Sequence, residues 1–418
     1  MQIEEAVVAL CRAARLAGRQ LATTPTPAKN AALRDAAARL RAGQAALLDA
    51  NRGDVAAAQA AGLSAALVDR LTLTPARIES MAGGLEAIAA LPDPVGETIM
   101  RWRRPNGLEI AQVRIPIGVV GMIYESRPNV TADAAGLCLK SGNAVILKGG
   151  SEAFATSRAI AAAIAAGIAS AGLPEAVVQL IPTTDRQAVA ALLRQREWVD
   201  VIVPRGGPSL IEAITAQSSI PVIQHYAGIC HVYVHAAADL GMAERIAVNA
   251  KVQRPGVCNA METLLVDRAV ADAFLPRVAA PLRAAGVELR GCPRTRAVLP
   301  DIGVATDEDW RTEYLDLILS VKVVDGLDDA IGFINTYGTG HSDAIVTDSL
   351  AAAQRFTAAV DSAAVYVNAS TRFTDGEEFG FGAEVGISTN RLHARGPMGL
   401  RELTTYKYVI QGAGQIRS

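Results

Sequence analysis

The chain has 418 residues, of which half are hydrophobic and a fifth are charged. The chain has 40 basic and 42 acidic side chains, so the formal net charge is −2. No broad positive field is available to hold nucleic acid or a membrane surface, and a small neutral or anionic partner is expected instead. This length predicts two or three domains of about 150 residues each.

Three features of the chain bear on its location in the cell. The N-terminal segment carries acidic side chains at once and is broken by Arg12 and Arg15, which is typical of an amphipathic surface helix and not of a signal peptide. The alanine-rich stretch 159–174 is too weakly hydrophobic for a membrane span. The cysteines are odd in number and have no C-x-x-C spacing, which favours reduced thiols without a structural metal. They are Cys11, Cys138, Cys230, Cys258 and Cys292. We expect a cytoplasmic protein that binds neither nucleic acid nor membrane.

The predicted elements change in character along the chain. Residues 1–98 have the long Ala/Leu/Arg periodicity of covering helices between Pro and Gly stops. Residues 99–117 alternate around a Pro-Asn-Gly turn and predict an exposed two-stranded ribbon suited to a subunit contact. From 117 to 218, apolar strand-like runs alternate four times with helical runs. This alternation predicts a parallel sheet covered on both faces.

Polar and glycine residues collect where strands of this predicted sheet end. The segment 148–152, Lys-Gly-Gly-Ser-Glu, follows one strand, and 205–207, Arg-Gly-Gly, follows another. Ligands of open parallel sheets bind at the carboxyl ends of the strands, so a nucleotide is the default ligand. Neither segment is a G-x-G-x-x-G motif, and any tight βα turn favours glycine. The pattern alone leaves a phosphate site and a plain turn about equally favoured.

A second alternating block, which begins after residue 235 and runs to 369, predicts a second α/β domain, and Cys258 belongs to it. This cysteine follows a predicted helix and lies in a Pro/Gly-containing bend before a strand, from which it can face a cleft between the domains. A thiol in such a bend serves either as a small core hydrophobe or as a nucleophile. The sequence alone slightly favours the core role for Cys258. Cys138 and Cys230 lie in apolar runs and are expected in the core.

Several longer motifs resemble the aldehyde dehydrogenase superfamily and, within it, the gamma-glutamyl phosphate reductase family. They are "ESRPNVTADAAGLCLKSGNAVILKGGSEA", "GICHVYV", "VCNAMETLLV", "RFTDGEEFGFGAEVGIST" and "HARGPMGL". The resemblance covers nearly the whole chain and implies two doubly wound α/β domains facing across a cleft, plus a small β oligomerisation arm. It implies an NADPH-binding domain at 1–98 and 118–230, a catalytic domain at 231–392, and an arm at 99–117 and 393–418.

The resemblance also implies an activity and a set of site residues. The family reduces L-glutamate 5-phosphate to L-glutamate 5-semialdehyde with NADPH through a cysteine thioester, a step of proline biosynthesis. Cys258 matches the nucleophile, and Asn129 falls near the asparagine that holds the oxyanion. The matches to the cofactor-binding residues are Lys148, Ser151, Glu152, Gly207 and Glu313. Lys148 corresponds to the lysine on the adenosine ribose, Gly207 opens the helix that meets the pyrophosphate, and Glu313 corresponds to the glutamate on the nicotinamide ribose.

Arginines are the candidates for the anionic parts of the reaction. Planar guanidinium groups suit both phosphate and carboxylate, and a nearby cation favours a thiolate. Arg127, Arg254 and Arg372 are the three that we consider. Most arginines in proteins are solvated, so each one taken alone is more often structural.

Three positions depart from the patterns of relatives. His225 stands near the place of the glutamate base of hydrolytic aldehyde dehydrogenases, Ala227 replaces an aspartate, and Phe333 replaces a histidine of the reductase signature. An acyl phosphate substrate needs no activated water, which agrees with the missing glutamate base. A hydrolytic aldehyde dehydrogenase and a non-catalytic nucleotide-binding protein of the same fold remain the alternatives. The resemblance further implies a homo-oligomer whose ribbon and tail, 402–414, pair between subunits, and substrate supply by glutamate 5-kinase.

Overall fold

The computed structural model describes residues 2–224 and 227–417. The chain forms two compact units. Unit 1 runs to Gln224 and also takes in Gly380–Gly386 and the residues from Met398 onward. Unit 2 runs from the segment after Gln224 to Phe379 and adds Ile387–Pro397. The predicted domain division between 230 and 231 falls near this break, inside unit 2.

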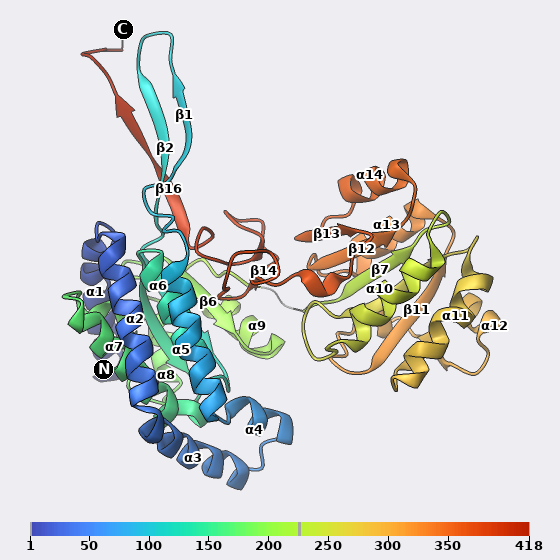
Figure 1. Cartoon of the computed structure of the whole chain (residues 1–418), viewed down its shortest axis with the longest axis horizontal. Helices are drawn as coiled ribbons and strands as arrows, with labels where there is room; N and C mark the ends of the chain where they lie inside the picture. The colour runs from blue at the N-terminus through green and yellow to red at the C-terminus, as the bar shows by residue number, and fades with distance from the viewer. Residues whose placement is uncertain (1, 225–226, 418) are drawn as a thin grey trace. The chain divides into compact units, whose positions relative to one another are not determined.

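Unit 1 begins with five helices that precede its sheet, as the periodicity predicts (Figure 1). Two of them begin at hydroxyl caps: Ser64 accepts a hydrogen bond from the amide of Leu67, and Thr74 accepts one from Arg77. The five helices are α1 (Gln2–Leu21), α2 (Thr26–Ala42), α3 (Gln44–Ala60), α4 (Ala65–Leu71) and α5 (Pro75–Ala90).

The sheet of unit 1 has four parallel strands in the order β5-β4-β3-β6. Strands β3 and β4 are buried along their whole length because helices lie on both faces of the sheet. The strands are β3 (Val119–Tyr124), β4 (Ala144–Gly149), β5 (Val178–Leu180) and β6 (Val201–Arg205). The helices that follow them are α6 (Asn129–Lys140), α7 (Phe154–Ser170), α8 (Gln187–Leu192) and α9 (Pro208–Gln217). The predicted fourfold alternation is confirmed.

Helix α7, with the short 3₁₀ turn before it, is long and apolar enough by composition to cross a membrane; among the residues that the structure describes, Ser151–Ser170 is the one such stretch. Within unit 1 this helix packs along α2 and α3. The contact with α2 is close, because a Cβ added at Gly167 would lie 2.6 Å from the backbone nitrogen of Ala36. Helix α7 therefore has the packing of a core helix.

A three-stranded antiparallel sheet forms the arm, with the order β1-β2-β16. It consists of β1 (Thr98–Arg103), β2 (Glu109–Pro116) and β16 (Thr404–Gln411), and Figure 1 shows the three strands side by side. The pairing runs in unbroken register from Thr404 opposite Pro116 to Gln411 opposite Glu109. The prediction that the tail pairs with the ribbon of another subunit is therefore wrong. The tail lies beside the ribbon of its own chain, where the full ladder of β2 is satisfied.

Unit 2 contains a seven-stranded parallel sheet in the order β10-β9-β11-β8-β7-β12-β13. Its strands are β7 (Cys230–Val234), β8 (Met261–Asp267), β9 (Glu288–Gly291), β10 (Gly303–Val304), β11 (Ile318–Val324), β12 (Ser342–Val346) and β13 (Ala364–Val367). Its helices are α10 (Leu240–Val252), α11 (Ala271–Ala284), α12 (Pro293–Val298), α13 (Leu327–Tyr337) and α14 (Leu350–Ala359). A short antiparallel pair, β14 (Ile387–Ser388) and β15 (Gly396–Pro397), completes the unit.

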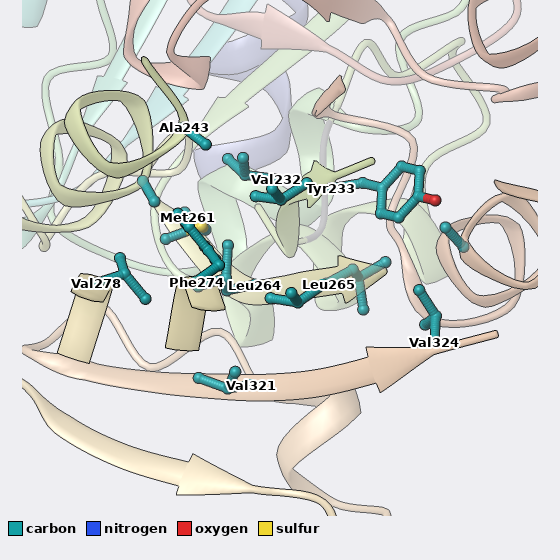
Figure 2. Packing of buried hydrophobic residues seen from close by; sticks show 14 of the residues in the cluster. Val232, Tyr233, Ala243, Met261, Leu264, Leu265, Phe274, Val278, Val321 and Val324 are labelled. Atoms are coloured by element: carbon teal, nitrogen blue, oxygen red, sulfur yellow. The ribbon is translucent and has the colours of Figure 1, made fainter. Parts of the chain in front are cut away.

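The core of unit 2 lies between the sheet and its helices. Figure 2 shows side chains of the central strands β7 and β8, such as Val232 and Leu264, which form one buried cluster with Phe274 and Val278 of α11. All seven residues of β8 are buried. Strand β8, which follows the Cys258 loop, is thus held rigidly in the core and anchors the end of that loop.

Candidate active site

A pocket of about 640 Å³ opens at the carboxyl ends of β3 and β4 in unit 1. Ligand pockets for small molecules measure roughly 300–1,000 Å³, so this one has room for a nucleotide. Three of the predicted cofactor residues, Lys148, Ser151 and Glu152, line it together. The carboxyl ends of the parallel strands thus border a pocket, as is usual for open parallel sheets.

Lys148 is the penultimate residue of β4 and is only 6% exposed. Its ammonium donates a hydrogen bond to the carbonyl of Gly149 at 2.9 Å. Burial lowers the pKa of Lys148, while the charges of Glu152 and Asp185 oppose that shift. The Lys148 ammonium is thus held at the buried end of a strand. A polar ligand could replace its hydrogen bond to the Gly149 carbonyl.

The carboxylate of Glu152 is fixed beside the same turn. One of its oxygens accepts hydrogen bonds from the amide and the hydroxyl of Ser126, at 2.6 and 2.7 Å. Ser126 has a positive φ of 41°, a sparsely populated conformation that these two bonds hold in place. A Cβ at Gly150 would collide with the Glu152 carboxylate. A side chain at 150 would therefore displace the Glu152 carboxylate from its position beside Ser126.

Gly207 is the residue before α9, which begins at Pro208. Its amide donates to a carboxylate oxygen of Glu125 at 3.1 Å, so the start of the helix already faces an anionic group. Space around the Gly207 Cα is open, since an added Cβ would meet nothing within 4 Å. The first turn of α9 lines the pocket through Ser209 and Leu210.

Asn129 is the first residue of α6 and its side chain is exposed. Its amide nitrogen donates to a carboxylate oxygen of Asp133, one turn later, at 3.0 Å. Burial raises the pKa of Asp133 to about 6. Asn129 and Arg127, which lies exposed in the bend before α6, belong to unit 1, whereas Cys258 belongs to unit 2.

Cys258 lies in the loop between α10 and β8 and is half-buried, whereas the other four cysteines are buried. Its carbonyl accepts a hydrogen bond from the thiol of Cys230 at 3.2 Å. The next residue anchors the loop: the Asn259 amide nitrogen donates to the carbonyl of Thr374 at 2.8 Å, and the Thr371 hydroxyl donates to the Asn259 carbonyl at 2.7 Å. The loop is held by its backbone, and the Cys258 thiol is left partly accessible.

Two of the predicted arginines accompany Cys258 in unit 2. Arg372 donates to the side-chain oxygen of Gln253 at 2.9 Å. Burial and the charge of Arg254 lower the pKa of Arg372, while a Cys258 thiolate would raise it. The charges of Arg254 and of a Cys258 thiolate thus both act on Arg372. A cation near a thiol favours its thiolate form.

Glu313 is connected to the Cys258 loop through Gly228. Its carboxylate accepts a hydrogen bond from the Gly228 amide at 2.9 Å, and the Gly228 Cα packs against the carbonyl of Cys258. Burial raises the pKa of Glu313, while the Gly228 hydrogen bond and the charge of Lys251 oppose that shift. The structure therefore joins two residues that lie 55 positions apart, a link that no sequence pattern indicated.

The positions that depart from the relatives' patterns have different surroundings. Phe333 is buried in an aromatic cluster with His231, Trp310 and Tyr337, where its ring is a core element. Ala227 is half-buried in the loop before β7, and His225 lies outside the described residues. The expectation that Cys138 and Cys230 are buried is confirmed.

Sequence reasoning missed several residues that the structure places at the two sites. Glu125, Ser126 and Arg186 line the unit 1 pocket, and the strand-end argument applied to β3 and to the segment after β5 would have found them. Gly228 and the ion pair of Lys251 with Glu262 lie next to the Cys258 loop. Nothing in their spacing distinguishes them from ordinary core residues. No group of three or more His, Cys, Asp and Glu suited to a metal ion occurs among the described residues.

Comparisons with known proteins agree with this arrangement. The chain matches the model of the aldehyde dehydrogenase family over residues 2–295 and 304–409. A gamma-glutamyl phosphate reductase of Moorella thermoacetica is 60% identical over 404 residues, which are 97% of each chain. One of Desulfatibacillum aliphaticivorans is 55% identical over 418 residues, the full length of both. The crystal structure of the Thermotoga maritima gamma-glutamyl phosphate reductase, 48% identical, superimposes with a TM-score of 0.97 and covers 99% of this chain and 100% of that one. The chain therefore belongs to the aldehyde dehydrogenase family, a family of oxidoreductases, and within it to the gamma-glutamyl phosphate reductase group.

Proposed function

We propose that the protein reduces L-glutamate 5-phosphate to L-glutamate 5-semialdehyde and phosphate with NADPH, as a step of proline biosynthesis. The observation that carries this proposal is the half-buried Cys258 in an anchored loop, within electrostatic range of Arg372. The full-length relatives named gamma-glutamyl phosphate reductase support the same substrate.

In this proposal the thiolate of Cys258 attacks the acyl carbonyl of the substrate. The negative charge that develops on the oxygen is held by the backbone N–H of Cys258 and the amide of Asn129. Asp133 accepts one N–H of that amide and leaves the other available to the oxyanion. Phosphate departs as a good leaving group, and an acyl thioester remains on Cys258. Arg127, Arg254 and Arg372 are the candidates for binding the phosphate and carboxylate groups.

The unit 1 pocket fits a nicotinamide dinucleotide by its volume and by its mixture of a buried cation, hydroxyls and glycines. Lys148, Ser151 and Glu152 would hold the adenosine ribose, Gly207 would stand at the pyrophosphate, and Glu313 would bind the nicotinamide ribose. Lys148 and Ser151 would favour NADPH over NADH by contacting its 2′-phosphate. When bound, NADPH supplies the hydride that reduces the thioester. The thiol of Cys258 is then released with the aldehyde.

Three further expectations belong to this proposal. The substrate would be supplied by glutamate 5-kinase, and the protein would work in the cytoplasm. A homo-oligomer would assemble through the arm, on which Tyr406, Tyr408 and Ile410 of β16 are 48%, 54% and 58% exposed. Exposed apolar side chains on an edge strand favour a subunit contact.

The direct test uses the purified protein with NADPH and L-glutamate 5-phosphate made in place by glutamate 5-kinase and ATP. We expect NADPH to be consumed and glutamate semialdehyde to form, with no consumption by Cys258→Ala. Cys138→Ala, which alters a buried cysteine of unit 1, serves as the matched control. NADPH binding without turnover would favour the non-catalytic alternative. Oxidation of the semialdehyde to free glutamate as the sole activity would favour the hydrolytic one.

A further inference from the structure

We propose that Lys251 and Glu262 are positioning residues whose buried ion pair closes the loop that carries Cys258 and fastens it to the segment that carries Glu313. The inference deepens the proposed function, because it concerns the alignment of the nucleophile with the residue expected at the nicotinamide ribose. Neither side chain is among the groups to which the proposed reaction assigns a contact with substrate or cofactor.

The ion pair spans the two ends of the Cys258 loop. Lys251 is the penultimate residue of α10, and Glu262 is the second residue of β8. The ammonium and one carboxylate oxygen lie 2.6 Å apart, and the side chains are 0% and 1% exposed. The loop between helix and strand is therefore closed at its base by a short, dry, charge-assisted contact.

The second oxygen of the same carboxylate reaches the other segment. It accepts a hydrogen bond from the backbone amide of Leu315 at 3.2 Å. Leu315 has a positive φ of 54°, which a leucine adopts only where surrounding contacts impose it. The Lys251 ammonium lies 5.8 Å from the ring centre of Tyr314, the residue before Leu315. Glu262 thus fixes the backbone of the segment 313–315 in a conformation that it would not adopt alone.

These contacts link Glu262 to Cys258 by a second route within unit 2, through Glu313 and Gly228. From Leu315 the chain leads to Glu313, whose carboxylate accepts the Gly228 amide at 2.9 Å. Gly228 in turn packs against the carbonyl of Cys258, where an added Cβ would lie 1.9 Å from the oxygen. The path runs from Glu262 through Glu313 and Gly228 back to Cys258. A shift at any member changes the position of the nucleophile relative to Glu313.

The chemistry of the pair argues for alignment and against a role in stability. Two charges removed from water lose most of their hydration, so a buried ion pair adds little to stability over apolar side chains of the same size. In some proteins such a pair instead fixes one geometry, because loss of either partner leaves an uncompensated buried charge, and we infer that role here. Glu262 makes two directed contacts: an ion pair with Lys251 of α10 and a hydrogen bond with the backbone amide of Leu315.

The test replaces the pair by apolar side chains in the double variant Lys251→Met/Glu262→Met. A matched control is Lys29→Met/Asp93→Leu, which removes a buried ion pair of unit 1 with N–O distance 2.8 Å. Three quantities are measured: the melting temperature, the rate at which iodoacetamide alkylates Cys258, and kcat and KM. We expect both double variants to fold. We expect kcat and the alkylation rate to fall roughly tenfold or more only in the first, because small displacements of a reacting atom cost up to about 10²-fold.

A single variant, Glu262→Gln, covers the case in which the double variant does not fold. It keeps an acceptor for Leu315 and removes the charge, and the same loss of alkylation is expected. Alkylation rates and kcat within twofold of wild type would overturn the proposal, as would loss of the fold in both variants while the control folds. Alkylation needs no substrate, so this outcome is separate from the proposed reaction. If glutamyl phosphate is not reduced by the wild type but alkylation still depends on the pair, only the proposed function fails.

Discussion

Replacement of Gly228 by alanine tests how tightly the nucleophile loop is held. The added Cβ would lie 1.9 Å from the carbonyl oxygen of Cys258, 2.6 Å from its carbonyl carbon and 2.7 Å from its Cα. All three are backbone atoms, so no rotation of a side chain relieves the overlap. Ordinary contacts between heavy atoms need about 3.5 Å, and the Cys258 backbone must therefore move by more than about 1 Å. The amide of position 228 keeps its hydrogen bond to Glu313 in the variant, so the change is steric.

The magnitude follows from this displacement. A shift of about 1 Å at the reacting group costs up to about 10²-fold in rate, while overpacking a core costs about 1–3 kcal/mol of stability. We expect Gly228→Ala to remain folded at 25 °C, to bind NADPH, and to lose about 10²-fold in kcat and in the rate of Cys258 alkylation. The assays are NADPH consumption, iodoacetamide labelling followed by mass spectrometry, and thermal unfolding.

Two glycines of the same unit provide controls. A Cβ at Gly256, in the Cys258 loop itself, would approach only the carbonyl of Leu315 at 3.6 Å, and one at Gly332 of α13 would meet nothing within 4 Å. Both alanine variants are expected to keep kcat within about threefold, because neither contact forces the backbone to move. A Gly228→Ala protein with wild-type kcat and alkylation rate would refute the account of the loop.

Three further outcomes are expected. Cys258→Ala should lose turnover and keep its melting temperature and NADPH affinity, and measurable steady-state reduction by this variant would contradict the thioester mechanism. Lys148→Ala should weaken NADPH binding roughly tenfold more than NADH binding in equilibrium titrations, because a charge-assisted contact to phosphate is worth about 1.5–3 kcal/mol; equal weakening of both would contradict it. Burial would raise the pKa of Asp309, yet hydrogen bonds from Arg290, Thr306 and Tyr314 lower it well below its usual range. The lowered pKa means that the ionised form stabilises the fold above about pH 4 and that this contribution is lost as the pH falls further. Asp309→Asn should therefore destabilise the protein by about 1–3 kcal/mol at pH 7 and flatten its acid-unfolding curve, whereas Asp301→Asn, at an exposed pair with Arg283, should do neither.

The architecture followed from the sequence because its signals are local. Alternating apolar runs and helical runs predict parallel sheets, and the rule that ligands bind at strand ends led to Lys148, Ser151 and Glu152, which the structure places in one pocket. The helical start of the chain and the ribbon around its Pro-Asn-Gly turn were equally visible. The family resemblance singled out Cys258, whose spacing alone slightly favoured a core role.

The contacts between segments that are distant in the sequence could not be predicted from it. Whether the tail strand β16 pairs with β2 of its own chain or of another depends on chain path, which no local pattern records. The same holds for Gly228, which looks like any loop glycine until its neighbour is known to be the Cys258 carbonyl. Lys251 and Glu262 each look like ordinary charged residues at element ends, and only tertiary packing shows that they are buried and paired.

The central claim is that Cys258 carries an acyl thioester which, in the reverse direction, is released by phosphate and not by water. It is tested most directly by running the reaction backwards from glutamate semialdehyde and NADP⁺ in buffers with and without inorganic phosphate. General-base assistance to water is typically worth about 10²–10⁴ in rate, and we expect His225 near the position where hydrolytic aldehyde dehydrogenases keep a glutamate base. We predict that steady NADPH formation requires phosphate, that arsenate substitutes for it, and that only a single-turnover burst appears without either. Steady NADPH formation at the same rate in phosphate-free buffer, with free glutamate as the product, would contradict the claim.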